Sequence, residues 1–307
     1  MKILVIGAGA VGGYFGGRLA QAGRDVTFLV RGRQADNIRK QGLHIVSPHG
    51  DATLYPRTLL ANELSNAFDL ILLSVKGYGL QPAINDFAPA VHQATMILPV
   101  LNGMRHIDLL IERFGEEVVI GGVCLVSSEV DKDGRIVQLT GTQRLVYGEL
   151  RGGPSERMNR LDTFMQGAGF EARISQDITQ EMWQKWVQLS SLGALTCLLR
   201  GNVGEVEAVP GGADTAKEIL RESSAIATAC GHPPREDFLG KVRSTLTTRG
   251  SNLTSSMYRD LVKGAHVEAD QIIGDLLDRG RKFGVDTPLL QAAYISLKIY
   301  EGRLSTK

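Results

Sequence analysis

Short apolar runs alternate with segments of helical spacing through the first half of the chain. Four of these runs, each bounded by Gly, Asp or Pro, are predicted to be strands: residues 1–7, 25–30, 68–75 and 94–102. They are apolar on both faces, which is typical of strands in a parallel sheet that helices cover on both sides. The first half of the chain therefore predicts an α/β domain.

More strands are expected beside these four, and then the strand pattern stops. Residues 42–59 are predicted to form a hairpin-type insertion with its turn at residues 49–51, and three extended runs lie within residues 118–150. A last strand is predicted over residues 170–176. From there on the pattern is helical, with long segments at 179–199, 213–230, 235–248, 255–263 and 268–283. This change predicts an α/β domain over residues 1–176 and an all-helical domain over residues 177–307.

Composition and charge narrow the classes of partner. The chain has 307 residues and a formal net charge of +1, so no overall field attracts nucleic acid or an anionic membrane. Its apolar runs, such as LILL at 70–73, are far shorter than the roughly 20 residues of a membrane span, and no secretory leader precedes the first strand. Three widely spaced cysteines suit a reducing compartment, and the six histidines form no metal-binding pattern. We expect a cytoplasmic protein with a small-molecule partner, no metal, no nucleic acid and no membrane.

A glycine-rich turn carries the strongest chemical signal. The stretch GAGAVGG (7–13) has the spacing GxGxxG directly after the first strand, and it opens a helix that Gly23 ends. The first glycine permits a tight turn, the second lets a pyrophosphate approach the backbone, and the third lets helix and strand pack closely. The helix N-terminus offers unpaired N–H groups to phosphates. The alternative is an ordinary glycine loop, but the strand–turn–helix context favours a Rossmann-type dinucleotide site. Its predicted residues are Gly7, Ala8, Gly9, Ala10, Val11 and Gly12.

The end of the second strand indicates which dinucleotide binds. A site for NAD usually has Asp or Glu there to accept from the ribose 2′-hydroxyl, whereas this chain has Arg31 and Arg33. A carboxylate repels a 2′-phosphate and an arginine pairs with it. A solvated basic turn that continues to Arg39 and Lys40 is the alternative, and it could account for Arg33. Arg31, at the expected ribose position, predicts NADP(H).

The stretch MWQKWVQLSSLGAL (182–195) holds both tryptophans, with Lys185 between them. In a helix, Lys185 shares a face with Met182, Leu189 and Leu192. Most such lysines lay their methylenes along apolar surface and reach water with the charged end. The alternative is that the ammonium group is held there for chemistry.

At this point the sequence resembles the ketopantoate reductases (2-dehydropantoate 2-reductases). The shared motifs are GAGAVGGYFGGRLAQAG (7–23) followed by Arg31, then SVKGY (74–78), LNGM (101–104), EMWQKW (181–186) and SSMYRDLVKGAHVEAD (255–270). They occur in family order over nearly the whole length. The resemblance implies a Rossmann domain, a helical domain, an active site in the cleft between them, and hydride transfer from NADPH to the carbonyl of a 2-oxo acid. In that family the product, pantoate, serves pantothenate and coenzyme A synthesis.

The resemblance also implies roles for three residues of the helical half. Lys185 matches the family's catalytic lysine, which would stabilise negative charge on the carbonyl oxygen and donate the proton. Glu268 matches the acidic residue that positions or reprotonates that lysine, and Ser256, twelve residues earlier, matches a substrate-binding serine. The alternatives are a surface carboxylate at a helix start for Glu268 and a simple helix cap for Ser256.

Two residues follow strands of the predicted sheet. Asn102 comes after the fourth strand and Lys76 after the third, at the carboxyl edge where open α/β sheets bind ligands. We expect Asn102 to contact the nicotinamide ribose or the substrate, and Lys76 to contact the cofactor. Turn chemistry is the alternative, above all for the Asn102-Gly103 pair.

The chain departs from the family at the substrate. Family members usually carry asparagines four and eight residues after the lysine, whereas this chain has Leu189 and Gly193. Three interpretations stay open: a ketopantoate reductase, a reductase of another carbonyl compound, and a sensor that binds NADPH without catalysis. The oligomeric state is open too, because the helical half can bury its apolar faces within a monomer or in a homodimer.

Overall fold

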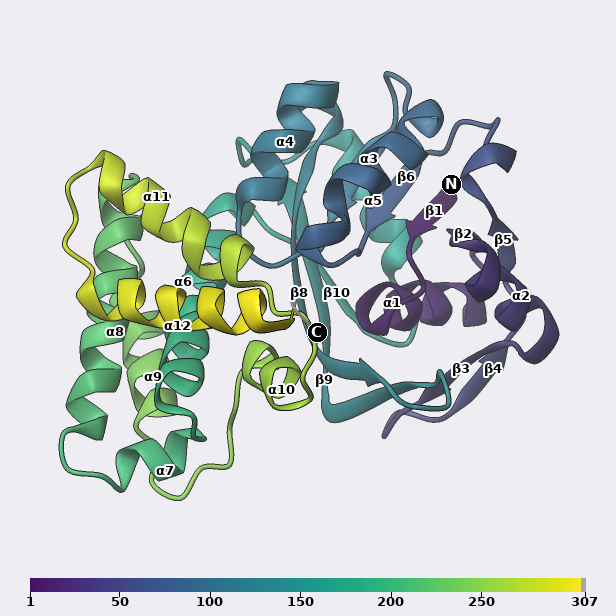
Figure 1. Ribbon diagram of the computed structural model, residues 1–307. Helices are drawn as coiled ribbons and strands as arrows, with labels where there is room; N and C mark the ends of the chain where they lie inside the picture. Colours follow the sequence, from purple (N-terminus) through teal and green to yellow (C-terminus); the bar gives the residue numbers. More distant parts are fainter. Residues whose placement is uncertain (305–307) are drawn as a thin grey trace. The chain divides into compact units, whose positions relative to one another are not determined.

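The computed structural model describes residues 1–304 and divides into two compact units (Figure 1). The first unit comprises Met1–Leu101 and His106–Thr179. The second comprises Asn102–Arg105 and the chain from Gln180 onward. Each unit is described by itself below.

The first sheet is fully parallel and forms the centre of the first unit. Its strand order is β5-β2-β1-β6-β7, so the first strand lies in the middle. The four predicted strands are all present, and Arg57–Leu59 adds a short fifth at the edge beside β2. The bounds are β1 Lys2–Ile6, β2 Asp25–Leu29, β5 Arg57–Leu59, β6 Leu70–Leu73 and β7 Met96–Pro99.

The second sheet is mixed, and it corrects two details of the sequence analysis. Its strands are β3 Leu43–Val46, β4 Ala52–Leu54, β8 Ile120–Val130, β9 Ile136–Glu149 and β10 Glu171–Ile174. The hairpin predicted over residues 42–59 exists only as β3 and β4, because the last part of that segment pairs with the first sheet. Two runs predicted within residues 134–150 form one strand, β9, because β8 pairs antiparallel with both halves of it across a register shift between Val126 and Ser128.

Helices and short turns connect the strands of this unit. A serine hydroxyl caps one of the helices: Ser155 accepts the Met158 N–H at 3.2 Å at the start of α5. The helices are α1 Ala10–Gln21, α2 Gly32–Gln41, α3 Leu80–Phe87, α4 Arg105–Phe114 and α5 Glu156–Met165, and the 3₁₀ turns are Ala61–Glu63, Gly77–Gly79, Ala88–Ala90 and Glu116–Val118.

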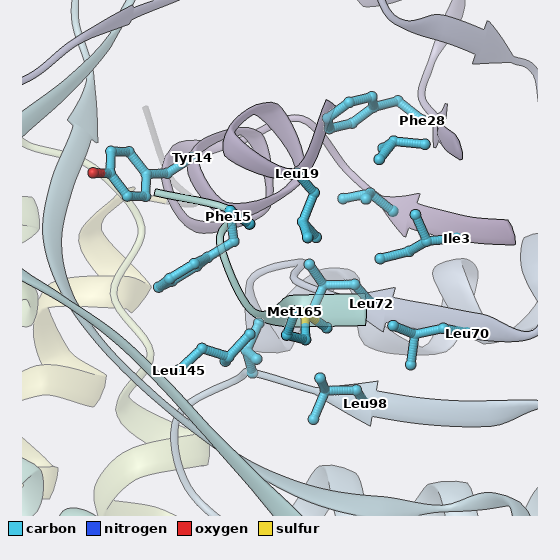
Figure 2. Close-up of a cluster of buried hydrophobic side chains, with 14 of the residues drawn as sticks. Ile3, Tyr14, Phe15, Leu19, Phe28, Leu70, Leu72, Leu98, Leu145 and Met165 are labelled. Atoms are coloured by element: carbon cyan, nitrogen blue, oxygen red, sulfur yellow. The ribbon is translucent and has the colours of Figure 1, made fainter. Parts of the chain in front are cut away.

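The core of the first unit lies between α1 and both sheets. Figure 2 shows Leu19 of α1 pointing toward Leu72 of the parallel sheet, with Met165 of α5 beside Leu72. Phe15 of α1 points to the side where Leu145 of β9 lies. All five side chains are fully buried or nearly so, and burial of each stabilises the fold by about 1.5–3 kcal/mol. Because these residues come from both sheets, the core joins them and fixes the N-terminal turn of α1 against the sheet.

The second unit is all-helical. Its first long helix, α6, carries Lys185, and α8 packs against α9, α11 and α12 (Figure 1). A π-turn, Asp270–Gly274, leads directly into α11. The helices are α6 Ile178–Leu199, α7 Val203–Glu207, α8 Gly212–Ala229, α9 Glu236–Leu246, α10 Ser256–Val262, α11 Asp275–Lys282 and α12 Pro288–Leu304.

Two features are absent from residues 1–304. None of the helices there is both long and apolar enough to cross a bilayer. The same residues contain no group of three or more His, Cys, Asp or Glu side chains placed to hold a metal ion.

Candidate active site

The glycine turn after β1 has the geometry that phosphate binding requires. Gly7 has φ +85°, a left-handed conformation that favours glycine, and its N–H donates to the Leu29 carbonyl at 3.0 Å. A β-carbon at Gly12 would meet the Ser74 hydroxyl oxygen at 1.9 Å, so only glycine lets α1 approach β6 this closely. A β-carbon at Gly9 would meet nothing within 4 Å. The space beside Gly9 is therefore open to a ligand.

Three side chains hold the carbonyl groups of this turn, and the sequence analysis found none of them. Gln34 donates to the Ala8 carbonyl at 3.0 Å, Ser128 to the Ala10 carbonyl at 2.9 Å, and Ser74 to the Ile6 carbonyl at 2.9 Å. They come from α2, β8 and the end of β6, which are far apart in sequence. Because these donors occupy the carbonyl side, the peptide N–H groups at the start of α1 face the other way.

These residues fit the phosphates of a dinucleotide. The first N–H groups of α1 have no partner inside the helix, as at any helix start, and they carry the positive end of the helix dipole. No side chain caps them, since the N-cap is Gly9 and Ala8 and Ala10 are small. The turn thus offers a phosphate group N–H donors, a positive potential and open space.

Arg31 lies at the N-cap of α2, directly after β2. Both Arg31 and Arg33 are exposed, and neither forms an ion pair within residues 1–304. Arg39, by contrast, hydrogen-bonds the Thr58 hydroxyl at 2.8 Å and lies 3.8 Å from Glu63. Of this basic segment, Arg31 is therefore available to an anion at the end of β2. The α2 helix that it begins is tied to the glycine turn through Gln34.

Lys76 lies at the same edge of the parallel sheet. It follows β6 at the start of the 3₁₀ turn Gly77–Gly79, two residues after Ser74, and its side chain is exposed. The glycine turn follows β1 and Arg31 follows β2. Because β1, β2 and β6 are adjacent and parallel, all three segments leave the sheet at its carboxyl edge.

Asn102 and Glu268 meet in the second unit. The Asn102 side-chain amide donates to a Glu268 carboxylate oxygen across 3.5 Å, a long contact. Glu268 is only 5% exposed, so the alternative of a surface carboxylate at a helix start is wrong for it. Asn102 follows β7, as expected, but its turn groups with the helical unit because Gly103 packs on the π-turn: a β-carbon there would lie 2.2 Å from the Gln271 carbonyl oxygen.

Lys185 lies on α6 between two buried tryptophans. Trp183 and Trp186 are 3% and 1% exposed and their ring centroids are 5.0 Å apart, whereas Lys185 is only half-buried. The indole N–H of Trp186 donates to the Ile272 carbonyl at 2.8 Å. The residue next to Lys185 is thus bonded to the π-turn that follows Glu268.

Ser256 is the first residue of α10, and it does not cap this helix. The cap is Ser255, whose hydroxyl accepts the Tyr258 N–H at 3.0 Å and lies 2.9 Å from the Thr196 hydroxyl on α6. The Ser256 hydroxyl has no hydrogen-bond partner in the described part of the chain. The structure therefore contradicts the helix-cap alternative for Ser256 and leaves its hydroxyl available to a ligand.

The two positions at which the chain departs from the family are apolar in the structure as well. Leu189 is half-buried on α6. Gly193 is buried against α10, and a β-carbon there would lie 2.8 Å from the terminal methyl of Met257. Met257 is itself 2% exposed, so it fills the space beside Gly193.

Known proteins resemble this chain over its whole length. The family models described as Ketopantoate reductase PanE/ApbA and Ketopantoate reductase PanE/ApbA C terminal match residues 3–152 and 177–301. The uncharacterized oxidoreductase YkpB of Bacillus subtilis is 35% identical over 98% of this chain and 99% of that protein. The 2-dehydropantoate 2-reductase of Mesorhizobium japonicum is 29% identical over 95% of each. The crystal structure of 2-dehydropantoate 2-reductase from Methylococcus capsulatus superposes with a TM-score of 0.86 at 29% identity, covering 99% of this chain and 98% of that one.

Proposed function

The chain belongs to the ketopantoate reductase family of oxidoreductases, and from this premise we propose that it reduces a 2-oxo acid with NADPH. The observation that carries the proposal is the buried Glu268 carboxylate, which contacts Asn102 and precedes the π-turn bonded to Trp186. Burying a carboxylate costs free energy, so a buried carboxylate is usually paired with another group or has a role in catalysis. The helix that carries Lys185 is anchored beside Glu268, and orienting that lysine would be such a role.

The first unit would hold the cofactor. The N–H groups from Gly9 to Gly12 would bind the pyrophosphate, and Arg31 would pair with the 2′-phosphate. Lys76, at the same sheet edge, is a further cation for the cofactor. The nicotinamide, when bound, supplies the hydride. Arg31 supports NADPH over NADH because it is a free cation at the position where an NAD site has a carboxylate.

The second unit would supply the acid and the substrate contacts. The Lys185 ammonium would stabilise negative charge on the carbonyl oxygen and then donate its proton to that oxygen. Glu268 would orient the ammonium group toward the substrate. Ser256 has an uncommitted hydroxyl and Asn102 an amide, so both could hydrogen-bond the substrate, and Asn102 could also reach the nicotinamide ribose.

The substrate we propose is a 2-oxo acid with a less polar tail than ketopantoate. Leu189 and the methyl of Met257 beside Gly193 are apolar where the family usually has amides. A buried polar group of a substrate that finds no partner costs about 1–3 kcal/mol. A hydroxylated tail would therefore bind poorly beside these side chains, and an aliphatic tail would bind better.

A panel of 2-oxo acids, from ketopantoate to acids with purely aliphatic tails, tests the proposal when NADPH and NADH oxidation are followed in parallel. We expect turnover with NADPH and the highest kcat/KM for an aliphatic tail. If kcat/KM is highest for ketopantoate, the protein is an ordinary ketopantoate reductase. Tight NADPH binding without turnover of any 2-oxo acid or ketone would instead identify a cofactor sensor and overturn the proposal.

A further inference from the structure

The backbone after Glu268 is unusual. Residues Asp270–Gly274 form a π-turn, in which the Asp275 N–H bonds to the Asp270 carbonyl, and such turns occur frequently at functional sites. Its outer end is fixed to α12, because Asp270 accepts from the Tyr294 hydroxyl at 2.7 Å and from the Lys298 ammonium at 3.0 Å. Burial by itself would raise the pKa of Asp270, but these hydrogen bonds outweigh it and lower that pKa, so the carboxylate stays charged.

The inner side of the π-turn is held by one side chain of α6. The Trp186 indole donates to the Ile272 carbonyl at 2.8 Å, and both residues are nearly fully buried. The indole is also covered by the Arg279 guanidinium, which lies 5.5 Å from a ring centroid and pairs with Asp275 at 3.2 Å. The hydrogen bond is thus shielded from water. In such a buried environment a hydrogen bond is stronger and more costly to lose.

The turn that carries Asn102 rests on the same place. Gly103 has φ +81° and lies against the Gln271 carbonyl, and the position of its missing β-carbon is 3.9 Å from the Trp186 indole nitrogen. The Trp186 indole, carried on the same helix as Lys185, therefore bonds to the π-turn that follows Glu268 and lies beside the loop of Asn102.

From this arrangement we infer that Trp186 is a positioning residue, whose indole N–H fixes Glu268 and Asn102 relative to Lys185. The inference rests on the proposed function for the roles of those three groups. Losing the bond lets the π-turn and the Asn102 turn shift against α6. An error of about 1 Å between catalytic groups is enough to lower a rate by about 10²-fold.

The test compares Trp186→Phe with Trp183→Phe. Both changes remove an indole from the same buried cluster, but the Trp183 indole makes no hydrogen bond in the described part of the chain, which makes it the matched control. Hydrogen exchange, read by mass spectrometry, should rise in peptides covering residues 268–275 and 102–105 only for Trp186→Phe. This readout needs no substrate, so it stands even if the proposed reaction is wrong.

Kinetics provide the second readout. We expect Trp186→Phe to lower kcat by about 10-fold or more with an unchanged Kd for NADPH, because the catalytic groups are displaced while the cofactor site is not. If Trp186→Phe does not fold, a benzothienylalanine analogue, which has no N–H, can be incorporated at residue 186 in the Trp183→Phe background. Equal effects in both tryptophan variants, or normal exchange and an unchanged kcat without the N–H, would overturn the inference.

Discussion

The Ser74 hydroxyl oxygen lies 1.9 Å from the point where a β-carbon on Gly12 would be. The corresponding point on Gly9, three residues earlier, has no atom within 4 Å. The two glycines of one motif therefore differ in what surrounds them. Gly12 is needed by the protein, because α1 must reach β6, whereas the open space at Gly9 is where we propose that the cofactor phosphates bind.

The first prediction separates these two requirements. Gly12→Ala should lower the free energy of unfolding by about 1–3 kcal/mol, the usual cost of overpacking. Gly9→Ala should leave unfolding unchanged, because φ at Gly9 is −81° and the space is open, yet it should weaken NADPH binding. Urea unfolding and cofactor titration of both variants test this. Normal NADPH affinity in Gly9→Ala would mean that the phosphates bind elsewhere.

The second prediction concerns the choice of cofactor. Since Arg31 is unpaired at the end of β2, Arg31→Ala should narrow the preference for NADPH over NADH by about 1–3 kcal/mol, the scale of a charged hydrogen bond. Arg33→Ala is the control, because it is also exposed but lies two residues further on. Equal Kd values for both cofactors in the unaltered protein would remove Arg31 from the site.

The third prediction concerns the acid. Lys185→Ala should lower kcat by about 10²-fold or more and leave both NADPH binding and urea unfolding near normal. Gln188→Ala, a half-buried change one turn further along α6, is the control for packing. Should Lys185→Ala turn over at the unaltered rate, the lysine only lays its methylenes along apolar surface and another group donates the proton.

The features that could be predicted from the sequence are those that depend on interactions between neighbouring residues. The parallel strands and the glycine turn follow from apolar runs and from GxGxxG, which act through neighbouring residues. The edge strand β5 was missed because Arg57–Leu59 is short and only its pairing with β2 makes it a strand.

The site residues that the sequence analysis missed act over long separations. No local sequence motif marks Gln34 or Ser128, because only the fold brings their side chains to the carbonyls of Ala8 and Ala10. The π-turn likewise has no signature in DQIIG. For Trp186 there was a signal, the pairing of both tryptophans with Lys185, but its partner, the Ile272 carbonyl, is 86 residues away.

The fourth prediction is a pH dependence of stability in the helical unit. Glu222 is fully buried and accepts the N–H groups of Leu289 and Leu290, at 3.0 and 2.8 Å, at the start of α12. Burial raises the pKa of Glu222 above its ordinary value of 4.5 despite these bonds. Because the folded state then holds the proton more tightly than the unfolded state, stability falls as pH rises above 4.5.

Glu218, one turn earlier on α8, provides a control of opposite sign. Its hydrogen bond from Arg221 lowers the pKa of Glu218, so its contribution is lost as pH falls below 4.5. Urea midpoints between about pH 3 and pH 8 should therefore show the unaltered protein losing stability relative to Glu222→Gln as pH rises above 4.5, and relative to Glu218→Gln as pH falls below 4.5. If the difference in urea midpoint from the unaltered protein changes with pH in the same direction for both variants, the pKa directions of Glu222 and Glu218 are not opposite and the prediction is wrong.

The last prediction concerns the substrate. A site that lacks two hydrogen-bond partners for a polar substrate loses about 1–3 kcal/mol for each, so kcat/KM for ketopantoate should be about 10² to 10⁴ below that of a site with both. Leu189→Asn/Gly193→Asn should recover part of this loss. The recovery at residue 193 requires the Met257 methyl, 2.8 Å from the new β-carbon, to turn aside, which the flexible end of a methionine can do.

Leu189→Ala/Gly193→Ala is the control for this test, because it shortens one side chain and adds the same β-carbon without adding an amide. If the amides act as hydrogen-bond partners, the asparagine pair should raise kcat/KM for ketopantoate and lower it for an acid with an aliphatic tail, while the alanine pair raises neither. The gain from the asparagines should appear mainly in kcat/KM, because their amides would hold the substrate in the ground state as well as in the transition state. An unaltered protein that reduces ketopantoate at about 10⁴ M⁻¹s⁻¹ or faster, with no gain from the asparagines, would show that Leu189 and Gly193 do not set the substrate.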